Sequence, residues 1–194
     1  MQPEPLIEID TRVLKEDYCN YDLVARCWND EYRGRVWKNK ERIADFEGTD
    51  LDEIMLELRA IVDAIQHDKR RERGKRKISA AALTDALAGI EPKLSRTQRA
   101  MLSVHARAPL QRVMMRAMLR LGDYATAELA FDEYVQVARR LSDELGYAPG
   151  SRRKDVYPGS ALLFSDDIVI DSVGPETVLV LRPEVTKAIE ALKW

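Results

Sequence analysis

Several groups of basic residues in this sequence have the composition and spacing to bind an anion. Arg112, Arg116 and Arg120 recur every four residues, which would stack their guanidinium groups in one row along a helix. Such cations hold phosphate groups by charge and release counterions without reading a base sequence. Two further groups are a run within residues 67–77, made of Lys69, Arg70, Arg71, Arg73, Lys75, Arg76 and Lys77, and a cluster made of Arg152, Arg153 and Lys154.

A second kind of group combines arginine with tryptophan. Alternation along two predicted strands, 22–28 and 32–38, places these residues on one face of each strand. A cation beside an exposed ring can contact phosphate and stack on a base. The alternative is an ordinary exposed face or a protein contact, because residues 1–66 carry 9 basic and 16 acidic residues and so repel phosphate. The residues of this face are Arg26, Trp28, Arg33, Arg35 and Trp37.

Charge is unevenly distributed along the 194 residues although the net charge is only -2. Residues 67–154 carry 19 basic and 10 acidic residues, whereas residues 155–194 carry 3 and 7. A basic middle segment raises the local concentration of polyanions. In the alternative, the acidic outer segments pair with the middle within one fold, or the basic run is a solvated helix end.

The motifs of the common enzyme classes are absent from the sequence. It has no Walker loop, Gly-rich dinucleotide turn, nucleophile elbow or HExxH motif, so we expect a protein that is not an enzyme and binds no cofactor. His105 follows Met101 and Leu102 at helical steps, which favours a packed histidine over a general base. Aspartates at 166, 167 and 171 are typical of turns. No metal site is expected, because the cysteines and histidines lack ligand spacing: Cys19, Cys27, His67 and His105.

The elements that would position these groups begin with a predicted β-meander. Its strands cover residues 6–9, 22–28, 32–38 and 41–47, with turns at 29–31 and 39–40. Asp50 and Glu53 have the spacing of a capping box, which predicts the start of a helix. From Leu51 to Ile65, apolar residues recur at helical steps, so this helix should pack against the sheet.

The rest of the chain is predicted to be mainly helical. Four helices are predicted over 79–88, 95–107, 109–122 and 126–145, followed by a hairpin of 162–164 with 168–170, a strand over 178–181 and a helix over 183–192. Helices followed by a β-hairpin predict a winged helix-turn-helix. The helix over 126–145 would be a poor reader of a DNA groove, because Glu128, Asp132 and Glu133 repel phosphates.

The predicted fold class is therefore α+β. A small antiparallel sheet packs on one helix, and a helical bundle with a β-hairpin wing follows. We expect a β-meander plus α-helix domain over 1–66, a basic linker and short helix over 67–93, and a winged-helix-like domain over 94–194.

Two stretches resemble known families. Residues 32–37 and 43–49, with the helix after them, are similar to the small sheet-plus-helix domains of HicB antitoxins and of arm-type and AP2 DNA-binding proteins. In the DNA-binding relatives, Arg and Trp on the open sheet face contact DNA. Residues 94–147 and 178–194, which include the segments Gln98 to Leu102 and Glu144 to Tyr147, resemble an uncharacterised bacterial winged-helix-like module sometimes attached to HNH nucleases. This second resemblance implies a DNA-associated context and no catalytic residue.

We therefore expect a non-enzymatic nucleic-acid-binding or regulatory protein, from a bacterium or mobile element, in which the central basic block contacts phosphates. DNA is favoured over RNA. The alternative is a protein-interaction module, such as a phage-type inhibitor or adaptor of a host nucleic-acid-handling complex, that uses its acidic N-terminal domain. Composition favours a cytoplasmic chain without a membrane segment, and a homodimer is compatible with either function.

Overall fold

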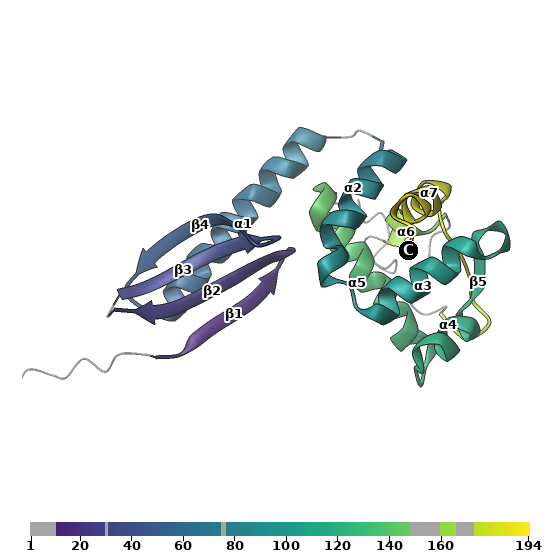
Figure 1. Ribbon diagram of the computed structural model, residues 1–194, viewed down its shortest axis with the longest axis horizontal. Coiled ribbons are helices and arrows are strands. Elements are labelled where there is room, and N and C mark those ends of the chain that lie inside the picture. The colour runs from purple at the N-terminus through teal and green to yellow at the C-terminus, as the bar shows by residue number, and fades with distance from the viewer. Residues whose placement is uncertain (1–10, 30, 75–76, 148–159, 166–172) are drawn as a thin grey trace, which may run out of the picture. The chain divides into compact units, whose positions relative to one another are not determined.

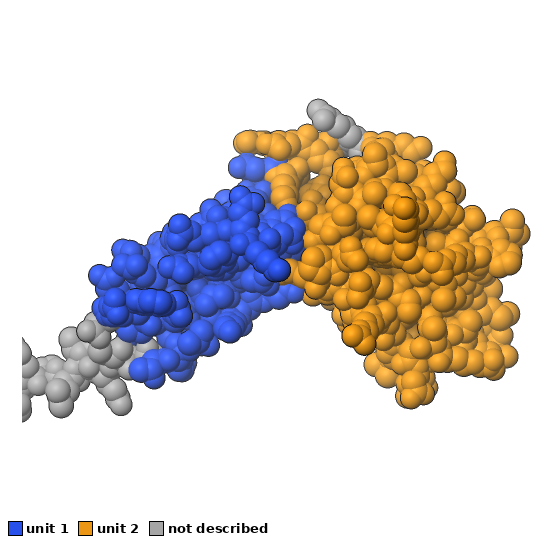
Figure 2. Space-filling view, in the orientation of Figure 1, with its two compact units in different colours: residues 1–68 blue, residues 69–194 orange. Residues whose placement is uncertain are grey.

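The computed structural model describes residues 11–29, 31–74, 77–147, 160–165 and 173–194. The chain forms two compact units, residues 1–68 and residues 69–194, which Figure 2 shows in different colours. The structure is α+β. Several predictions fall outside the described residues, namely the strand over 6–9, the second hairpin strand over 168–170, and five basic residues of the predicted site: Lys75, Arg76, Arg152, Arg153 and Lys154.

The first unit contains an antiparallel sheet of four strands in the order β1-β2-β3-β4. The strands are β1 (Val13–Tyr18), β2 (Tyr21–Trp28), β3 (Glu31–Lys38) and β4 (Glu41–Gly48). The last three confirm the predicted meander. Strand β1 was not predicted, because the charged residues of the sequence VLKEDY hide its alternation. Asn29 and Asn39 adopt positive φ in the turns, as expected of asparagine.

Helix α1 (Leu51–Arg73) lies behind this sheet (Figure 1). It covers the face that carries Leu23, Ala25 and Val36, and together these residues form the core of the first unit. Gly34 permits this close approach: a Cβ there would lie 2.3 Å from Cγ2 of Ile54. One face of the sheet is thus buried, and the alternate residues of β2 and β3 lie on the opposite face.

The start of α1 differs in detail from the predicted capping box. The side chain of Asp50 accepts the backbone N–H groups of Asp52 and Glu53, as predicted. Glu53, however, accepts from the backbone and hydroxyl of Thr49 rather than from Asp50. At its other end α1 continues through half of the basic run, so residues 67–73 are helical, and Gly74 follows with a positive φ.

The second unit is built mainly from helices. Its helices are α2 (Ala80–Ile90), α3 (Arg96–Arg107), α4 (Met115–Gly122), α5 (Ala127–Leu145), α6 (Ser160–Leu163) and α7 (Pro183–Leu192), with 3-10 turns η1 (Glu91–Lys93) and η2 (Pro109–Gln111). The capping box of Ser95 and Gln98 is present, Thr126 and Gly146 cap α5, and α7 has its predicted bounds. Helix α2 continues to Ile90, past its predicted end at 88. Gly89 therefore lies within the helix, and its missing Cβ leaves room for Glu144 of α5.

Two predictions for the second unit are wrong. Pro109 begins a 3-10 turn and not a helix, because Leu110 and Gln111 adopt positive φ, and strand β5 (Arg112–Met114) precedes α4. The predicted hairpin arm over 162–164 is helical at Leu162 and Leu163. Strand β6 (Val178–Val180) pairs antiparallel with β5, and an isolated bridge joins Phe164 to Leu181.

Aromatic residues and a histidine form the centre of the second core. Phe131, Tyr134 and Phe164 are almost completely buried, and the rings of Tyr134 and Phe164 meet edge to face at 5.3 Å. His105 lies against both of them and is fully buried. The prediction of a packed histidine is confirmed. Among the described residues, no helix has the length and apolar character needed to cross a membrane.

Candidate functional site

The open face of the first sheet brings the predicted arginine and tryptophan residues together. They line one shallow hollow of about 440 Å³. The hollow lies on this face because side chains alternate along a strand, and the neighbouring residues of β2 and β3 are buried in the core against α1. The sequence therefore placed these residues correctly with respect to each other. The lining consists of Val24, Arg26, Trp28, Arg33, Arg35 and Trp37.

Two like charges stand directly opposite each other on this face. Arg26 of β2 pairs in register with Arg33 of β3, an arrangement that costs free energy unless the cations are separated or neutralised. Arg26 turns towards its own strand, where its guanidinium carbon lies 4.1 Å from the centre of the Trp28 ring. Trp28 is 50% exposed, so this cation and ring form a stacked pair in contact with solvent.

Carboxylates of the same strand and of the neighbouring strand hold the other two arginines. Arg33 forms ion pairs with Glu31 and Glu47, and Nε of Arg35 lies 3.2 Å from Oδ1 of Asp45. These pairs are exposed and contribute little free energy, but they orient the guanidinium groups. Each guanidinium has five N–H donors. Arg35 is engaged through Nε, which leaves its terminal nitrogens for a ligand, whereas Arg33 also engages Nη2 with Glu31 and keeps only Nη1 for one. The acidic residues of this sheet thus position the arginines and also reduce the net charge of the face.

Residues of the basic run lie either on the exposed surface of the second unit or beside a small pocket. Arg70 and Arg71 are exposed on the last turns of α1. Arg73 is half-buried, and its guanidinium carbon lies 4.6 Å from the centre of the Tyr147 ring. Lys77 is exposed and lines a small pocket together with Arg73. Lys69 is half-buried.

The predicted row of guanidinium groups on one helix is not present. Arg112 lies in β5, opposite Val180, and only Arg116 and Arg120 belong to α4. All three are exposed, and Arg116 forms an ion pair with Glu176. Spacing of four residues aligns side chains only while the helix continues, and here the helix begins after Arg112.

Helix α5 presents an acidic outer surface at its start, as predicted. Its apolar stripe, including Phe131, Tyr134 and Leu141, is buried. Glu128 and Asp132 are exposed, and Leu129 between them is 50% exposed. Hydrogen bonds from its own backbone N–H and from Thr126 lower the pKa of Glu128, so this carboxylate stays ionised near neutral pH.

His105 is the most strongly perturbed histidine of the described chain, but it faces the core. Burial lowers its pKa to about 4, although its hydrogen bonds to Leu179 and Gln111 oppose this effect. Nε2 faces the carbonyl oxygens of those two residues at 3.1 Å, so Nε2 must carry the proton and donate. Nδ1 then accepts from the hydroxyl of Tyr134 at 3.0 Å. His105 therefore fastens β6 to α3 and α5 rather than acting on a ligand.

Sequence reasoning missed two residues that join Arg73 and Lys77 in the pocket. Tyr147 follows α5, and Arg182 caps α7. Neither belongs to a basic run or a periodic pattern, so no signal in the sequence linked them to the other two. Within the described segments, no group of three or more His, Cys, Asp or Glu residues is arranged to hold a metal ion.

Comparison with known proteins gives no match to this chain among family models, curated proteins or solved structures.

Proposed function

We propose that this protein is a non-enzymatic nucleic-acid-binding regulatory protein, whose N-terminal sheet face contacts the nucleic acid. The observation that carries the proposal is the guanidinium of Arg26 stacked on the half-exposed ring of Trp28, with Arg33 directly across the sheet. Arg26 is turned onto Trp28, and Arg33 is oriented by its pairs with Glu31 and Glu47, so both guanidinium groups are positioned on this face. A phosphate bound between them would be attracted by both cations.

Stacking supports the proposal from a second direction. Trp28 and Trp37 both line the hollow, and aromatic rings beside cations are the groups on which successive bases stack. Each stacked base contributes about 1–3 kcal/mol to binding, whichever base it is. The face therefore suits bases or phosphates that approach an open sheet, and its resemblance to the sheets of arm-type and AP2 DNA-binding domains favours DNA over RNA.

Two features of the second unit support the same proposal. Arg70, Arg71, Arg112 and Arg120 are exposed and would contact phosphates without base specificity. The element order α3, β5, α4, α5, β6, with β6 bonded to β5 and the following Leu181 bridged to Phe164, supports a winged-helix-like domain. The acidic start of α5 indicates that this helix does not enter a groove.

The test measures binding of the full chain to fluorescent single-stranded DNA, duplex DNA and RNA by anisotropy over a series of salt concentrations. We expect affinity to fall steeply with salt, because phosphate contacts release counterions. The double variant Arg26→Glu with Arg33→Glu should abolish binding. Trp28→Ala should remove about 1–3 kcal/mol of the binding free energy by loss of stacking.

Arg12→Glu serves as the control for the single variants Arg26→Glu and Arg33→Glu, since each of the three makes the same charge change in the same unit. Arg12 is exposed and pairs with Asp52 at the start of α1, away from the hollow. This variant should bind as the wild type does. Equal losses in Arg12→Glu and in either single variant would mean that only overall charge matters, and absence of binding to all three nucleic acids at low salt would refute the proposal.

A second candidate function is a protein-interaction module. It is favoured by the excess of acidic residues in the first unit, 16 against 9 basic over residues 1–66, which disfavours the approach of phosphate. A phage-type inhibitor or adaptor would use this surface against a basic protein partner. In that case a partner captured from a host lysate should remain bound after nuclease treatment and be released by salt.

A further inference from the structure

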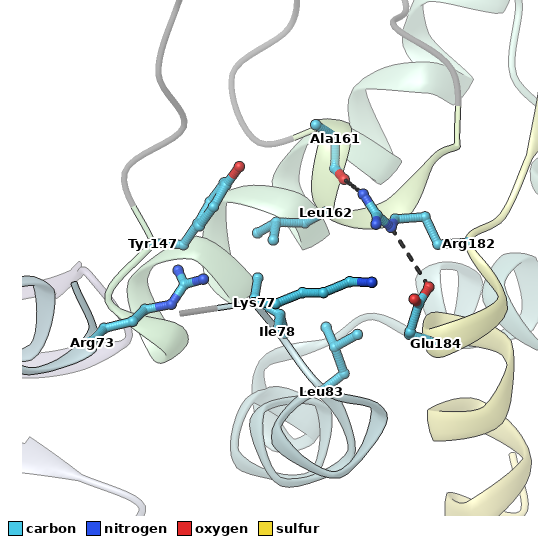
Figure 3. Close-up of a pocket in the computed structure, with 9 residues that line it drawn as sticks. All are labelled: Arg73, Lys77, Ile78, Leu83, Tyr147, Ala161, Leu162, Arg182 and Glu184. Atoms are coloured by element: carbon cyan, nitrogen blue, oxygen red, sulfur yellow. Dashed lines mark hydrogen bonds and ion pairs between the residues drawn. The ribbon is translucent and has the colours of Figure 1, made fainter. Parts of the chain in front are cut away.

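We propose that the pocket between the end of α1 and the start of α7 binds a compact, doubly charged oxyanion, of the class of phosphate and phosphate monoesters. This site belongs to the second unit alone, is separate from the sheet face, and does not depend on the function proposed above. Its walls come from segments far apart in the sequence (Figure 3). Its lining consists of Arg73, Lys77, Ile78, Leu83, Tyr147, Ala161, Leu162, Arg182 and Glu184.

Charge in the pocket is unbalanced. Among the described residues that line the pocket, Arg73, Lys77 and Arg182 carry a positive charge and Glu184 carries a negative charge. The pKa of Glu184 is lowered, first by the bond from its own backbone N–H and further by Arg182 and Lys77, so it is ionised at neutral pH. The formal charges of these four described residues sum to plus two, which a dianion would match.

The contacts of Arg182 leave most of its donors for a ligand. Its Nη1 donates to the carbonyl oxygen of Ala161 at 3.0 Å, and its Nε lies 3.7 Å from Oε2 of Glu184. The second distance is too long for a strong hydrogen bond. Figure 3 shows the guanidinium held above the pocket by these two groups, with the side chain of Lys77 extending towards the same side. A planar guanidinium held in place is well suited to two oxygens of one phosphate.

Size and wall chemistry narrow the class of ligand. The pocket has a volume of about 190 Å³, well below the 300–1,000 Å³ of typical drug-sized ligand sites. Ile78, Leu83 and Leu162 form apolar walls, which exclude competing water and strengthen the attraction between opposite charges. The ring of Tyr147, which lies against the Arg73 guanidinium, would form the wall of the pocket opposite Arg182. A phosphate with a small substituent meets all these conditions.

The test titrates the full chain with inorganic phosphate by isothermal calorimetry, against chloride at equal ionic strength. Lys77→Gln should weaken phosphate binding about tenfold, because it removes one of the excess charges. Glu184→Gln should strengthen it about tenfold, because it removes the competing carboxylate. Lys187→Gln is the matched control: Lys187 is exposed on α7 and does not line the pocket, so its substitution should leave affinity unchanged.

A further arm separates the two sources of such a phosphate. Short oligonucleotides with and without a 5′-phosphate are compared on the wild type and on Lys77→Gln. A terminal nucleic-acid phosphate is the ligand if the 5′-phosphate raises affinity in the wild type only, and a free phosphate compound is the ligand if inorganic phosphate binds while the two oligonucleotides do not differ. The proposal is overturned if no saturable binding of either kind occurs, or if Glu184→Gln fails to strengthen it. A misfolded variant would not bind more tightly, so the Glu184 arm remains decisive if Lys77→Gln is unstable.

Discussion

The two units use their aromatic residues in opposite ways. In the first, Trp28 and Trp37 line an open hollow, and the core on the other side of the sheet is mostly aliphatic. In the second, Phe131, Tyr134 and Phe164 lie together with His105 in the interior. A strand separates its two faces residue by residue, so a binding face can vary there without disturbing the core. This difference can be tested by substitutions of matched type in the two units.

The largest expected effect compares Phe164→Ala with Trp28→Ala. Phe164 is 2% exposed and stacks on Phe131 at 5.9 Å, so its removal leaves a cavity and should cost about 3–5 kcal/mol of unfolding free energy in the second unit. Trp28 is 50% exposed, and its removal should cost no more than about 0.5 kcal/mol. Hydrogen exchange of peptides from each unit measures both. Equal destabilisation by the two changes would contradict the comparison.

The next effect is a dependence on pH confined to the second unit. Burial lowers the pKa of His105 to about 4, so between pH 4 and about 6.5 the unfolded chain binds a proton that the folded chain does not. Stability should therefore fall as pH drops through this window, by about 3 kcal/mol in all for this difference in pKa.

The measurement is urea denaturation across that pH range, followed by hydrogen exchange in each unit. His105→Gln should remove the part of the slope that belongs to the histidine, leaving only that of the carboxylates. The hydrogen bonds to Leu179 and Tyr134 also make this variant less stable at neutral pH. An unchanged slope in the variant would show that His105 is not responsible.

A smaller effect concerns the packing that supports the sheet face. Gly34→Ala places a Cβ 2.3 Å from Cγ2 of Ile54, and the helix must shift to accept it. We expect a loss of about 1–3 kcal/mol in the first unit, from overpacking. Gly174→Ala in the second unit is the control, because a Cβ there meets nothing within 4 Å, and thermal unfolding should not distinguish it from the wild type. A neutral Gly34→Ala would mean that α1 is not seated closely on β3.

A small change in stability is expected of Arg35→Gln. Its ion pair with Asp45 is exposed, so unfolding free energy should change by less than about 1 kcal/mol. Nucleic-acid affinity should fall nevertheless, since the substitution removes a charge from the hollow. Arg116→Gln breaks a comparable exposed pair with Glu176 and is the control in the second unit. If Arg35→Gln lowered stability by several kcal/mol without affecting binding, the sheet face would be structural.

Much of the fold was predictable wherever the residues that begin or end an element lie within it or directly beside it. The Ser95 and Gln98 capping box, Gly146 after α5 and the first-turn proline of α7 each satisfy or end a helix locally, and the structure has all three. Strand β5 escaped prediction because Pro109 is equally suited to a helix start. The positive φ of Leu110 and Gln111 prevents a helix from starting at Pro109, and these residue types do not indicate such a backbone conformation.

The candidate sites were likewise predictable only where one kind of element positions all of their residues. Alternation within β2 and β3 predicted the residues of the sheet hollow, because strand geometry fixes which side chains share a face. The row of Arg112, Arg116 and Arg120 failed once a strand interrupted it. The pocket around Arg182 could not be predicted, since it joins α1, α2, α6 and α7, and periodicity within one element says nothing about another.

The strand pairings imply an order of events during synthesis. Every strand of the first sheet bonds to the one made just before it, so that unit can form while the ribosome is still extending the chain. Strand β5 can pair only after β6 has been synthesised, and β6 follows it in the sequence by more than half the length of the second unit. The hydrogen bond from Nε2 of His105 to the carbonyl of Leu179 requires the same segment. Until β6 has been synthesised, the core of the second unit is incomplete, and Phe164 and its aromatic neighbours cannot be fully buried. These exposed rings would be sites to which chaperones bind.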